Sequence, residues 1–483
     1  MRLEVNVTHG GFRHGRALSS RRHRDNWSWP VAVLGSILMM ATTLPPCRAG
    51  EAATAATPPA VNEGPSGRIV AAESNTSLRQ ILEDLLARNP AIASANAQAL
   101  ADAEKASQVK ALPDPLLNVT AFPLSPETRV GPQQAMFGVS QKFPWFGKLK
   151  LREKAASEDA MAARALVEAK RLSLITEARR LYDEIGFLTA YERVLRSDRD
   201  VLSHYEELAR TRYASGVGLE QAVVKLQAEI TRDETRLLDL ARQRATLVST
   251  LNSLRDMPSE TPIPTPEIPI YPQLSLNVED LKQTALASRP EIAEADARIE
   301  RAKTMFDLAG KDYDPDVTFG LSYTLVGGRT DAAGLAMPPP DNGKNILGIS
   351  ATFNLPVWKE KLGAGVEETV QRQLAARSAK RSIVTAIDRD IGDLLQRIPL
   401  TWDQLHLFAD VLAVQAEESL RSAEAGYAAG THSALDLLDA ERVLLDVRTG
   451  TERARADYAI AIARLEGAIG ALVAESVKKG EVK

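Results

Sequence analysis

Cysteine and aromatic residues are scarce in this sequence, and their scarcity limits the folds that it can adopt. The 483 residues include a single cysteine, Cys47, so no disulfide can form within the chain. Phenylalanine, tryptophan and tyrosine make up only 5% of the residues, while alanine, leucine, glutamate and arginine crowd long stretches. This balance is typical of long helices and argues against an all-β protein.

Excess charge and metal-ligating residues are also missing. The net charge of -4 and the pI near 6.0 give no basic field that would attract nucleic acid. Beyond the first 49 residues the histidines are His204, His406 and His432, which are far apart and have no histidine or cysteine at ligand spacing. No phosphate-binding loop or nucleophile elbow is present. We therefore expect no nucleic-acid partner, no metal, no cofactor and no enzymatic activity.

Residues 1–49 have the parts of an export signal. A basic region contains Arg13 and Arg24, an apolar run follows at residues 31–40, and small residues near Ala49 suit cleavage. The alternative is a membrane anchor, but the apolar run is shorter than the roughly 20 residues that a spanning helix needs. No later segment of that length is free of charges. We interpret residues 1–49 as a signal peptide.

Cys47 lies at the signal boundary and is a candidate lipidation site. Leu44-Pro45-Pro46-Cys47 resembles the Leu-x-x-Cys box of bacterial lipoproteins, although Pro46 stands where that box has a small, flexible residue. The alternative is that Cys47 is simply removed with the signal.

The rest of the chain contains an internal duplication. The segment that begins at Asn89-Pro90 recurs at Arg289-Pro290, and Tyr213-Ala-Ser-Gly216 recurs as Tyr427-Ala-Ala-Gly430. The two repeats are expected at residues 77–256 and 278–472, separated by a stiff, proline-rich linker at 257–277. Residues 50–76 form a flexible leader rich in alanine, proline and serine, where we expect little helix, and residues 473–483 form a C-terminal tail.

Each repeat contains two candidate β-strands. Apolar residues alternate with small or polar ones in four segments, which we place at about 116–124, 134–143, 317–326 and 347–356. Strands of this length and alternation suit a membrane β-barrel. A half-buried hairpin in a soluble domain fits the same pattern.

Long helices are expected over most of the remaining chain, at residues 147–255 and 360–472. Leucines recur every seven residues from Leu174 to Leu202, which predicts a coiled-coil seam. The first long helix contains no proline and only one interior glycine, Gly186, whereas Pro399 should kink its counterpart in the second repeat. In both repeats we expect the long helix to end at a Tyr-x-x-Gly turn, after which a second helix runs back in the opposite direction.

Four strands cannot close a barrel, and open edges are not tolerated in lipid, so an oligomer is needed. Three chains would supply twelve strands and a ring of helical hairpins. At this point the sequence resembles the outer-membrane efflux (TolC-like) family. The resemblance covers roughly Leu78 to Leu472, and Phe143-Pro144-Trp145-Phe146-Gly147-Lys148-Leu149 is similar to the strand-to-helix junction of its heavy-metal-efflux branch.

The resemblance implies a fold and a function. The fold is mainly α, with a barrel of long helical hairpins and four β-strands in each protomer that close as a 12-stranded membrane barrel in a homotrimer. The function is a passive duct from the periplasm across the outer membrane of a Gram-negative bacterium, in contact with membrane lipid. Its partners would be a periplasmic adaptor (membrane fusion protein) and an inner-membrane transporter of the RND type, and its cargo could include heavy-metal cations.

The resemblance also implies a periplasmic gate beside the second turn. It assigns the narrowest ring to Asp436 and Asp439, with His432 adjacent, and it places the helix-turn tips at Tyr213, Gly216, Tyr427 and Gly430. The two aspartates are three residues apart and share a helix face, where three copies would favour cations. A solvated helix face is the plain alternative. The best-known member of the family has arginine where His432 stands and an acid where Ala222 stands, so we instead expect His432 to make opening respond to pH.

Two other classes of protein fit parts of the pattern. An outer-membrane channel for type I secretion would share the whole architecture and differ only in its partners. A periplasmic coiled-coil adaptor or structural protein would share the signal and the helices but would lack the duplicated strands. The sequence does not specify the exported substrate.

Overall fold

The computed structural model describes residues 64–473. The signal peptide with Cys47, the first part of the leader and the tail beyond residue 473 therefore lie outside the described residues. The elements follow one another in the order α1 (Pro65–Ala72), α2 (Thr76–Arg88), α3 (Pro90–Lys110), β1 (Leu116–Ala121), β2 (Gln133–Phe143), α4 (Lys148–Ala214), α5 (Glu220–Leu254), α6 (Val278–Ser288), α7 (Pro290–Lys311), β3 (Val317–Val326), α8 (Ala332–Ala336), β4 (Ile346–Phe353), α9 (Lys359–His406), the π-helical turn η1 (Leu407–Leu412), α10 (Ala413–Ala429) and α11 (Ala434–Ile469).

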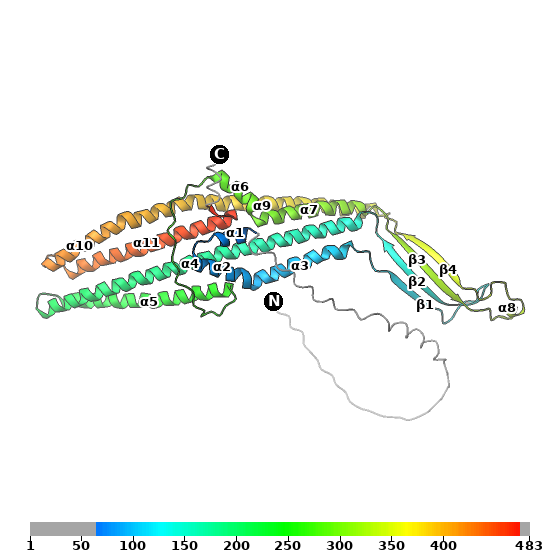
Figure 1. Cartoon of the computed structure of the whole chain (residues 1–483), viewed down its shortest axis with the longest axis horizontal. Coiled ribbons are helices and arrows are strands. Elements are labelled where there is room, and N and C mark those ends of the chain that lie inside the picture. The colour runs from blue at the N-terminus through cyan, green and yellow to red at the C-terminus, as the bar shows by residue number, and fades with distance from the viewer. Residues whose placement is uncertain (1–63, 474–483) are drawn as a thin grey trace, which may run out of the picture. The chain divides into compact units, whose positions relative to one another are not determined.

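The described residues are mainly helical with one small sheet, as the sequence predicts. The strands form an antiparallel sheet in the order β1-β2-β3-β4, in which β2 of the first repeat pairs with β3 of the second. Figure 1 shows this sheet at one end of the described residues and the α4–α5 and α10–α11 turns at the other. The sequence of elements from α2 to α5 recurs from α6 to α11, with α8 and η1 as additions.

The longest helix, α4, has 67 residues and therefore extends for about 100 Å at 1.5 Å per residue. It passes through Gly186 without interruption. A Cβ atom at Gly186 would lie 2.9 Å from Cγ1 of Ile268 in the proline-rich segment, so the missing side chain lets that segment approach α4 closely. In the second repeat α9 continues through Pro399 to His406, and the irregular turn comes later, at η1.

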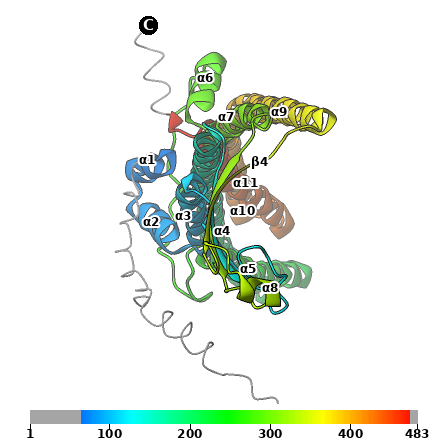
Figure 2. The ribbon, with the colours of Figure 1, turned by 90° about the vertical axis from the view of Figure 1, so that its right-hand side faces the viewer.

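Two apolar clusters anchor the short helices to the long ones. Ile81, Leu82 and Leu85 of α2 pack with Leu181 and Ile185 of α4, and all five are at most 1% exposed. Burial on this scale stabilises the fold by about 1.5–3 kcal/mol for each large side chain. The matching cluster of the second repeat joins α6, α9 and α11. Figure 2 shows α1 and α2 on one side of α4 and the helices α9, α10 and α11 on the other.

One expectation about the leader is wrong. Residues 50–76 were expected to contain little helix, but α1 occupies Pro65–Ala72 within that range. Ile69 and Val70 of α1 are 2% and 3% exposed and join the cluster around α2 and α4. Tertiary burial therefore stabilises a helix in a segment whose composition alone disfavours one.

The proline-rich segment between α5 and α6 contains no helix or strand, but it is not a free spacer. Asn252 Nδ2 donates to the carbonyl oxygens of Ser259 and Thr261 at 3.1 and 2.8 Å, and Tyr458 Oη donates to the carbonyl of Pro272 at 2.8 Å. Ile263 is buried beside α2. These contacts fasten the connection between the two repeats to α5 and α11.

Candidate functional site

The turn after α10 is built around two glycines. Gly430 has φ of +76°, a left-handed conformation that glycine adopts without strain. The N–H groups of Thr431 and His432 donate to the carbonyl of Gly426 at 2.9 and 3.1 Å. A Cβ atom at Gly426 would lie 2.6 Å from the ring of His432, so this ring packs directly on the end of α10.

Asp436 lies in the first turn of α11 and pairs with Ser433, the N-cap residue of that helix. Its Oδ2 accepts hydrogen bonds from the backbone N–H and the hydroxyl of Ser433, both at 2.8 Å, while Ser433 Oγ accepts from the N–H of Asp436 at 3.3 Å. This reciprocal arrangement is a capping box. The N–H of Ser433, then its hydroxyl, lower the pKa of Asp436 below its ordinary value. Asp436 therefore carries a negative charge and also stabilises the start of the helix.

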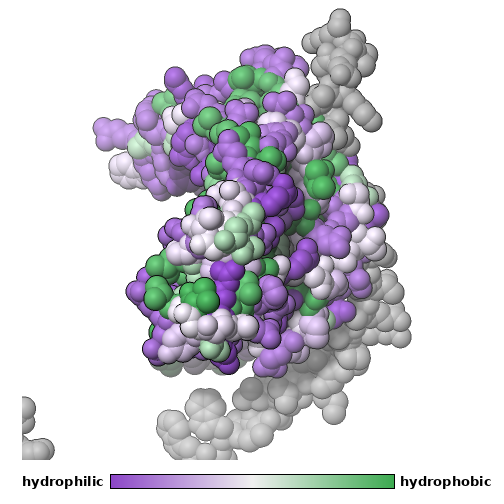
Figure 3. Space-filling model, turned by 90° about the vertical axis from the view of Figure 1, so that its left-hand side faces the viewer, coloured by the Kyte–Doolittle hydropathy of each residue, from purple (hydrophilic) through white to green (hydrophobic). Residues whose placement is uncertain are grey.

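Asp439 has a looser environment. Its side chain is 74% exposed, and its ion pair is with Arg442, at 3.5 Å. Arg442 also pairs with Glu229 of α5, which links the two hairpins. Asp436, Asp439 and His432 all remain exposed at this end of the chain. The face that carries the turns is mostly hydrophilic with scattered apolar side chains (Figure 3).

The first turn resembles the second in its backbone but differs in its side chains. Gly216 has φ of +78°, and the N–H groups of Val217 and Gly218 donate to the carbonyl of Arg212 at 3.0 Å each. Tyr213, however, is 47% exposed, whereas its counterpart Tyr427 is 7% exposed within an apolar cluster. The repeated Tyr-x-x-Gly pattern predicts both turns but not the opposite environments of the two tyrosines.

Arg212, which is not among the residues expected from the sequence, connects the two turns. Its guanidinium lies 4.1 Å from the ring centroid of Tyr427, and its Nη2 donates to the carbonyl of Ala428 at 3.1 Å. Such a cation–π contact contributes about 0.5–1 kcal/mol at an exposed site. The second repeat has Gly426 at the position of Arg212, and this asymmetry is the signal that could have indicated it.

The strand-to-helix junction at residues 144–147 is organised by Asp316, which is also not among the residues expected from the sequence. Asp316 Oδ1 accepts from the N–H of Trp145 at 3.0 Å and from Lys148 Nζ at 2.9 Å, and its Oδ2 lies 3.1 Å from Lys142 Nζ. Gly147 precedes α4 with φ of +89°. Lys148 is 3% exposed and also donates to the carbonyl of Asp314.

The remaining junction residues are less engaged. Pro144 is half-buried, and the ring of Trp145 contacts that of Phe146 edge to face with 5.9 Å between centroids. Phe146 is 85% exposed. Burial alone would raise the pKa of Asp316, but the hydrogen bonds from Lys148, Trp145 and Lys142 outweigh it and lower that pKa to about 2. Asp316 is therefore ionised at all moderate pH values.

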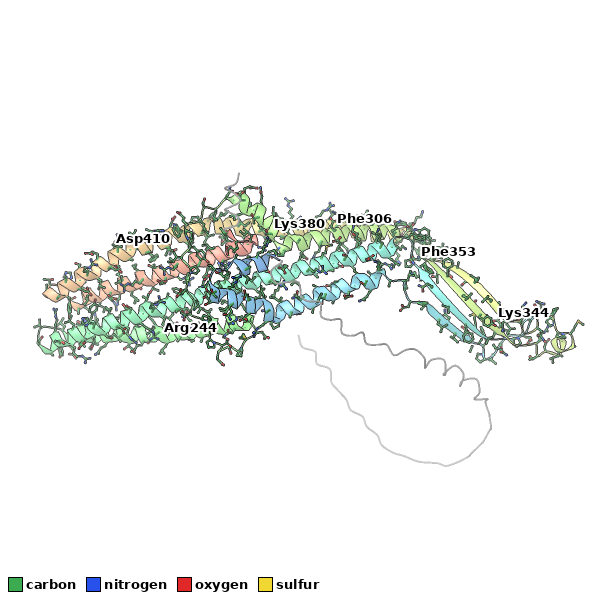
Figure 4. The ribbon with its side chains drawn as sticks, viewed as in Figure 1. Arg244, Phe306, Lys344, Phe353, Lys380 and Asp410 are labelled. Carbon is green, nitrogen blue, oxygen red and sulfur yellow. The ribbon has the colours of Figure 1, made fainter. Side chains whose placement is uncertain are left out.

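The sheet has one apolar face and one small or polar face. Leu117, Val139, Leu321 and Ile349 are aligned across the four strands, and each is at least 50% exposed. The neighbouring row on the other face consists of Asn118, Gly138, Ser322 and Gly348. Strand β1 pairs only with β2, and β4 only with β3, within the described residues. Figure 4 marks Phe353 at the end of β4 near the helices and Lys344 just before that strand.

Between residues 64 and 473, no helix combines the length and the apolar character that crossing a membrane requires. Within the same residues, no group of three or more histidine, cysteine, aspartate or glutamate side chains has an arrangement that could hold a metal ion.

Comparison with known protein families identifies the chain. The family model described as outer membrane efflux protein matches residues 81–255 and 281–471, which include both repeats. The chain belongs to the outer membrane efflux protein family. Its membership confirms the resemblance noted from the duplication, the junction and the turns. It places this efflux protein in the outer membrane of a Gram-negative bacterium and in a family of efflux proteins rather than of enzymes.

This efflux protein aligns with part of the length of each of two curated relatives. The outer membrane protein TolC of Escherichia coli (strain K12) is 26% identical over 315 residues, which cover 59% of this chain and 60% of TolC. The probable outer membrane lipoprotein SilC of Salmonella typhimurium is 26% identical over 325 residues, covering 63% and 65% of the two chains. The efflux protein thus spans less than two thirds of the length of these two relatives.

Solved structures share the fold over more of the chain. The outer membrane protein VceC of Vibrio cholerae has a TM-score of 0.67 at 21% identity, and the alignment covers 82% of this chain and 96% of VceC. CusC has a TM-score of 0.66 at 16% identity, covering 82% and 92%. Both alignments cover 82% of this chain, so the efflux protein shares the fold of VceC and CusC.

Proposed function

We propose that three copies of this chain form a passive channel that carries solutes from the periplasm through the outer membrane to the exterior. The observation that carries the proposal is the sheet. Its apolar row of Leu117, Val139, Leu321 and Ile349 suits contact with lipid tails, while Asn118 and Ser322 on the other face suit a water-filled lumen.

The edges of the sheet support a trimer. β1 and β4 present unpaired backbone groups on their outer sides, and such groups are very costly in the hydrocarbon of a membrane. Pairing β1 of one chain with β4 of the next satisfies both edges. Three chains then close a barrel of twelve strands, within the range of membrane barrels, and place three pairs of helical hairpins in the periplasm.

The hairpin end supplies the constriction of this channel. Asp436 and Asp439 lie in the first turns of α11, both exposed, and Asp436 is held ionised by Ser433. Three copies would bring six carboxylates together and would favour cations over anions. His432, packed on the end of α10, is proposed to adjust this constriction with pH.

The partners and cargo follow from the same proposal. A passive duct needs an energy source elsewhere, so we assign a periplasmic adaptor and an inner-membrane transporter as partners. The resemblance of residues 143–149 to the heavy-metal-efflux branch, together with an acidic constriction, favours heavy-metal cations as cargo. The two Tyr-x-x-Gly turns and Arg212 lie where an adaptor would meet the channel.

Single-channel recording in planar bilayers tests the channel and its constriction together. The purified full chain should give pores that prefer cations, and Asp439→Asn should reduce that preference because one carboxylate is lost from every chain. Asp446→Asn is the matched control, since Asp446 is an exposed acid farther along the same helix. It should leave selectivity unchanged.

The alternatives predict other results. Pores that are equally selective in wild type and Asp439→Asn would support the proposed channel but contradict the assignment of its constriction to this residue. A folded chain that forms no pores, or that is a water-soluble monomer, would contradict the channel. Unchanged conductance between about pH 5.5 and 7.5, the range in which an unperturbed imidazole titrates, would remove the role of His432.

A further inference from the structure

Three buried acids lie between the two hairpins, away from the turns. Asp198 of α4, Asp233 of α5 and Glu441 of α11 are 5%, 1% and 2% exposed. We call these residues the acid triad. Buried acids are rare unless they are paired with cations, so three from three different helices require an explanation.

The acid triad occupies core positions of the helix seams. Each acid lies three residues after one apolar residue and four before the next: Leu195 and Leu202 on α4, Ile230 and Leu237 on α5, and Leu438 and Leu445 on α11. These side chains belong to the two apolar clusters on either side of the triad. The triad therefore forms a polar layer between two apolar layers, where water is largely excluded and charge is costly.

The hydrogen bonding of the triad is incomplete when all three acids are ionised. Asp198 Oδ1, Asp233 Oδ2 and Glu441 Oε2 have no hydrogen-bond donor in the described part of the chain. The Asp198 carboxyl lies within hydrogen-bond reach of both Asp233 and Glu441. Two carboxylates cannot donate to each other, but a proton on Asp198 supplies the missing donor.

The cations around the triad are mostly engaged elsewhere. Arg236 of α5 donates to Asp233 Oδ1 at 2.9 Å and is the cation that contacts the triad directly. The other charged and titratable groups that face this layer have partners of their own or are tyrosines. Glu229 on α5 pairs with Arg232 on the same helix and with Arg442 on α11, and Arg448 on α11 pairs with Glu417 on α10. The tyrosines are Tyr191 and Tyr205 on α4, and Tyr205 is hydrogen-bonded to Glu424 on α10. Too little positive charge remains for three carboxylates.

The electrostatics agree with this geometry. Burial first, and then the neighbouring Asp233 and Glu441, raise the pKa of Asp198 to about 9. Burial also raises the pKa of Glu441, although the hydrogen bond with Asp198 and the charge of Arg448 oppose that shift. A proton therefore resides in the triad at neutral pH.

We propose that the acid triad is a proton-dependent clamp that fastens α5 to α4 and α11. With a proton on Asp198, its hydroxyl donates to a neighbouring carboxylate and one negative charge is removed from the layer, so the helices pack. Without it, adjacent negative charges repel one another in a medium of low dielectric constant, and α5 loosens. Because α5 begins just after the first turn, its release would widen the hairpin end. That last step rests on the proposed channel function, whereas the clamp itself does not.

The direction of the pH effect follows from proton linkage. A folded-state pKa of about 9, well above the ordinary value of 3.8, means that the packed state holds a proton that the loosened state releases. The clamp is therefore fully effective below about pH 4 and weakens as the pH rises, until the loss is complete near pH 9. In that window the opening equilibrium should increase about tenfold for each pH unit.

Hydrogen exchange of the full chain in detergent tests the clamp. Protection of the α5 amides, corrected for intrinsic exchange, should fall about 100-fold from pH 6 to pH 8 in the wild type, since two pH units each contribute about tenfold. The amides of α3 serve as an internal reference. Asp198→Asn keeps a hydrogen-bond donor but removes the acid that holds the proton, so the pH dependence of its α5 protection should be much weaker than in the wild type. Asp200→Asn removes an exposed acid two residues away and should behave as the wild type.

Other outcomes overturn the clamp. Equal pH dependence in wild type and Asp198→Asn would show that the triad merely sets the register of the helices, which is the usual role of a polar residue in a coiled-coil core. If Asp198→Asn does not fold, Glu441→Gln serves in its place: it removes one of the acids that raise the pKa of Asp198, so the pH dependence of α5 protection should be weaker than in the wild type, and an unchanged dependence would count against the clamp. Pores that open with rising pH in the wild type but not in Asp198→Asn would link the clamp to conduction. If hydrogen exchange follows the prediction but the chain forms no pores, the proposed channel function is contradicted and the clamp is supported.

Discussion

Single residues determine how the two hairpin turns differ. Gly216 and Gly430 adopt nearly the same left-handed backbone, and each ends a long helix. The tyrosines before them diverge because Tyr427 packs under Arg212 within an apolar cluster, while Tyr213 faces solvent. The two turns therefore present different chemistry to any partner, despite a shared local pattern.

Gly430 and Gly392 form a matched pair for testing the backbone argument. A Cβ atom would meet no atom within 4 Å at either position, but Gly430 has φ of +76° and Gly392 lies inside α9. Gly430→Ala should destabilise the hairpin by about 1–2 kcal/mol, the cost of a left-handed alanine. Gly392→Ala should stabilise the fold by about 0.5–1 kcal/mol. Chemical unfolding followed by circular dichroism measures both changes, and equal effects would contradict the assignment of strain to Gly430.

Some of the candidate site could be predicted from single residues, and some could not. The capping role of Asp436 is visible in the local pattern Ser433-x-x-Asp436. The acid triad also left a signal, because Asp198 interrupts the leucine seam between Leu195 and Leu202. The contact of Arg212 with Tyr427 joins residues from different repeats, so no local pattern specifies it.

At the scale of elements, the junction between strand and helix depends on one carboxylate. Asp316, just before β3, binds the N–H of Trp145 and the ammonium groups of Lys142 and Lys148. It therefore couples the end of β2 to the start of β3 and of α4.

Acid should reveal the contribution of Asp316. Because its folded-state pKa is lowered to about 2, its stabilising effect is present above about pH 4 and is lost as the pH falls towards 2. Asp316→Asn should lower the melting temperature at pH 7, and this difference should shrink as the pH approaches 2. Asp312→Asn is the control, since Asp312 is exposed and lies 3.7 Å from Lys148. A difference between wild type and Asp316→Asn that is independent of pH would contradict the role of its charge.

Most elements could be predicted from periodicity, and the exceptions have physical causes. The seven-residue leucine spacing indicated α4, and the alternation around Val317 indicated β3. The start of α1 could not be predicted because its stability comes from burying Ile69 and Val70 against other helices. Strand ends were also imprecise: β1 ends at Ala121 and β4 at Phe353, earlier than the alternating patterns suggested.

At the scale of the whole molecule, the two repeats are joined in a single sheet, to which each contributes two strands. β2 and β3 pair along their length, from Phe143 opposite Val317 to Gln133 opposite Val326, and this pairing aligns the apolar rows of the two repeats. The duplication predicted two pairs of strands, but not that they would join side by side. That joining depends on contacts between residues far apart in sequence, which periodicity does not record.

Two neighbours on β4 test which face meets lipid. Ile349 is 84% exposed on the apolar face, and Ser350 points to the other face of the strand. In a membrane barrel Ile349→Arg should cost about 2–4 kcal/mol if it lies near the middle of the bilayer, and should reduce insertion. Ser350→Arg should preserve insertion and change selectivity instead. Membrane fractionation and mobility of unheated samples in gels measure insertion and trimer formation, and the reverse pattern would invert the assignment of the faces.

The unpaired edges of β1 and β4 also have a genetic consequence. In the proposed trimer each chain completes its sheet only by pairing with two others, so maturation is a reaction between molecules rather than within one. A chain that inserts normally at one edge but is damaged at the other would still be recruited, and it would spoil the assembly that accepted it. Lesions at these two strands should therefore be dominant when a normal gene copy is present, whereas lesions that prevent the chain from folding at all should be recessive.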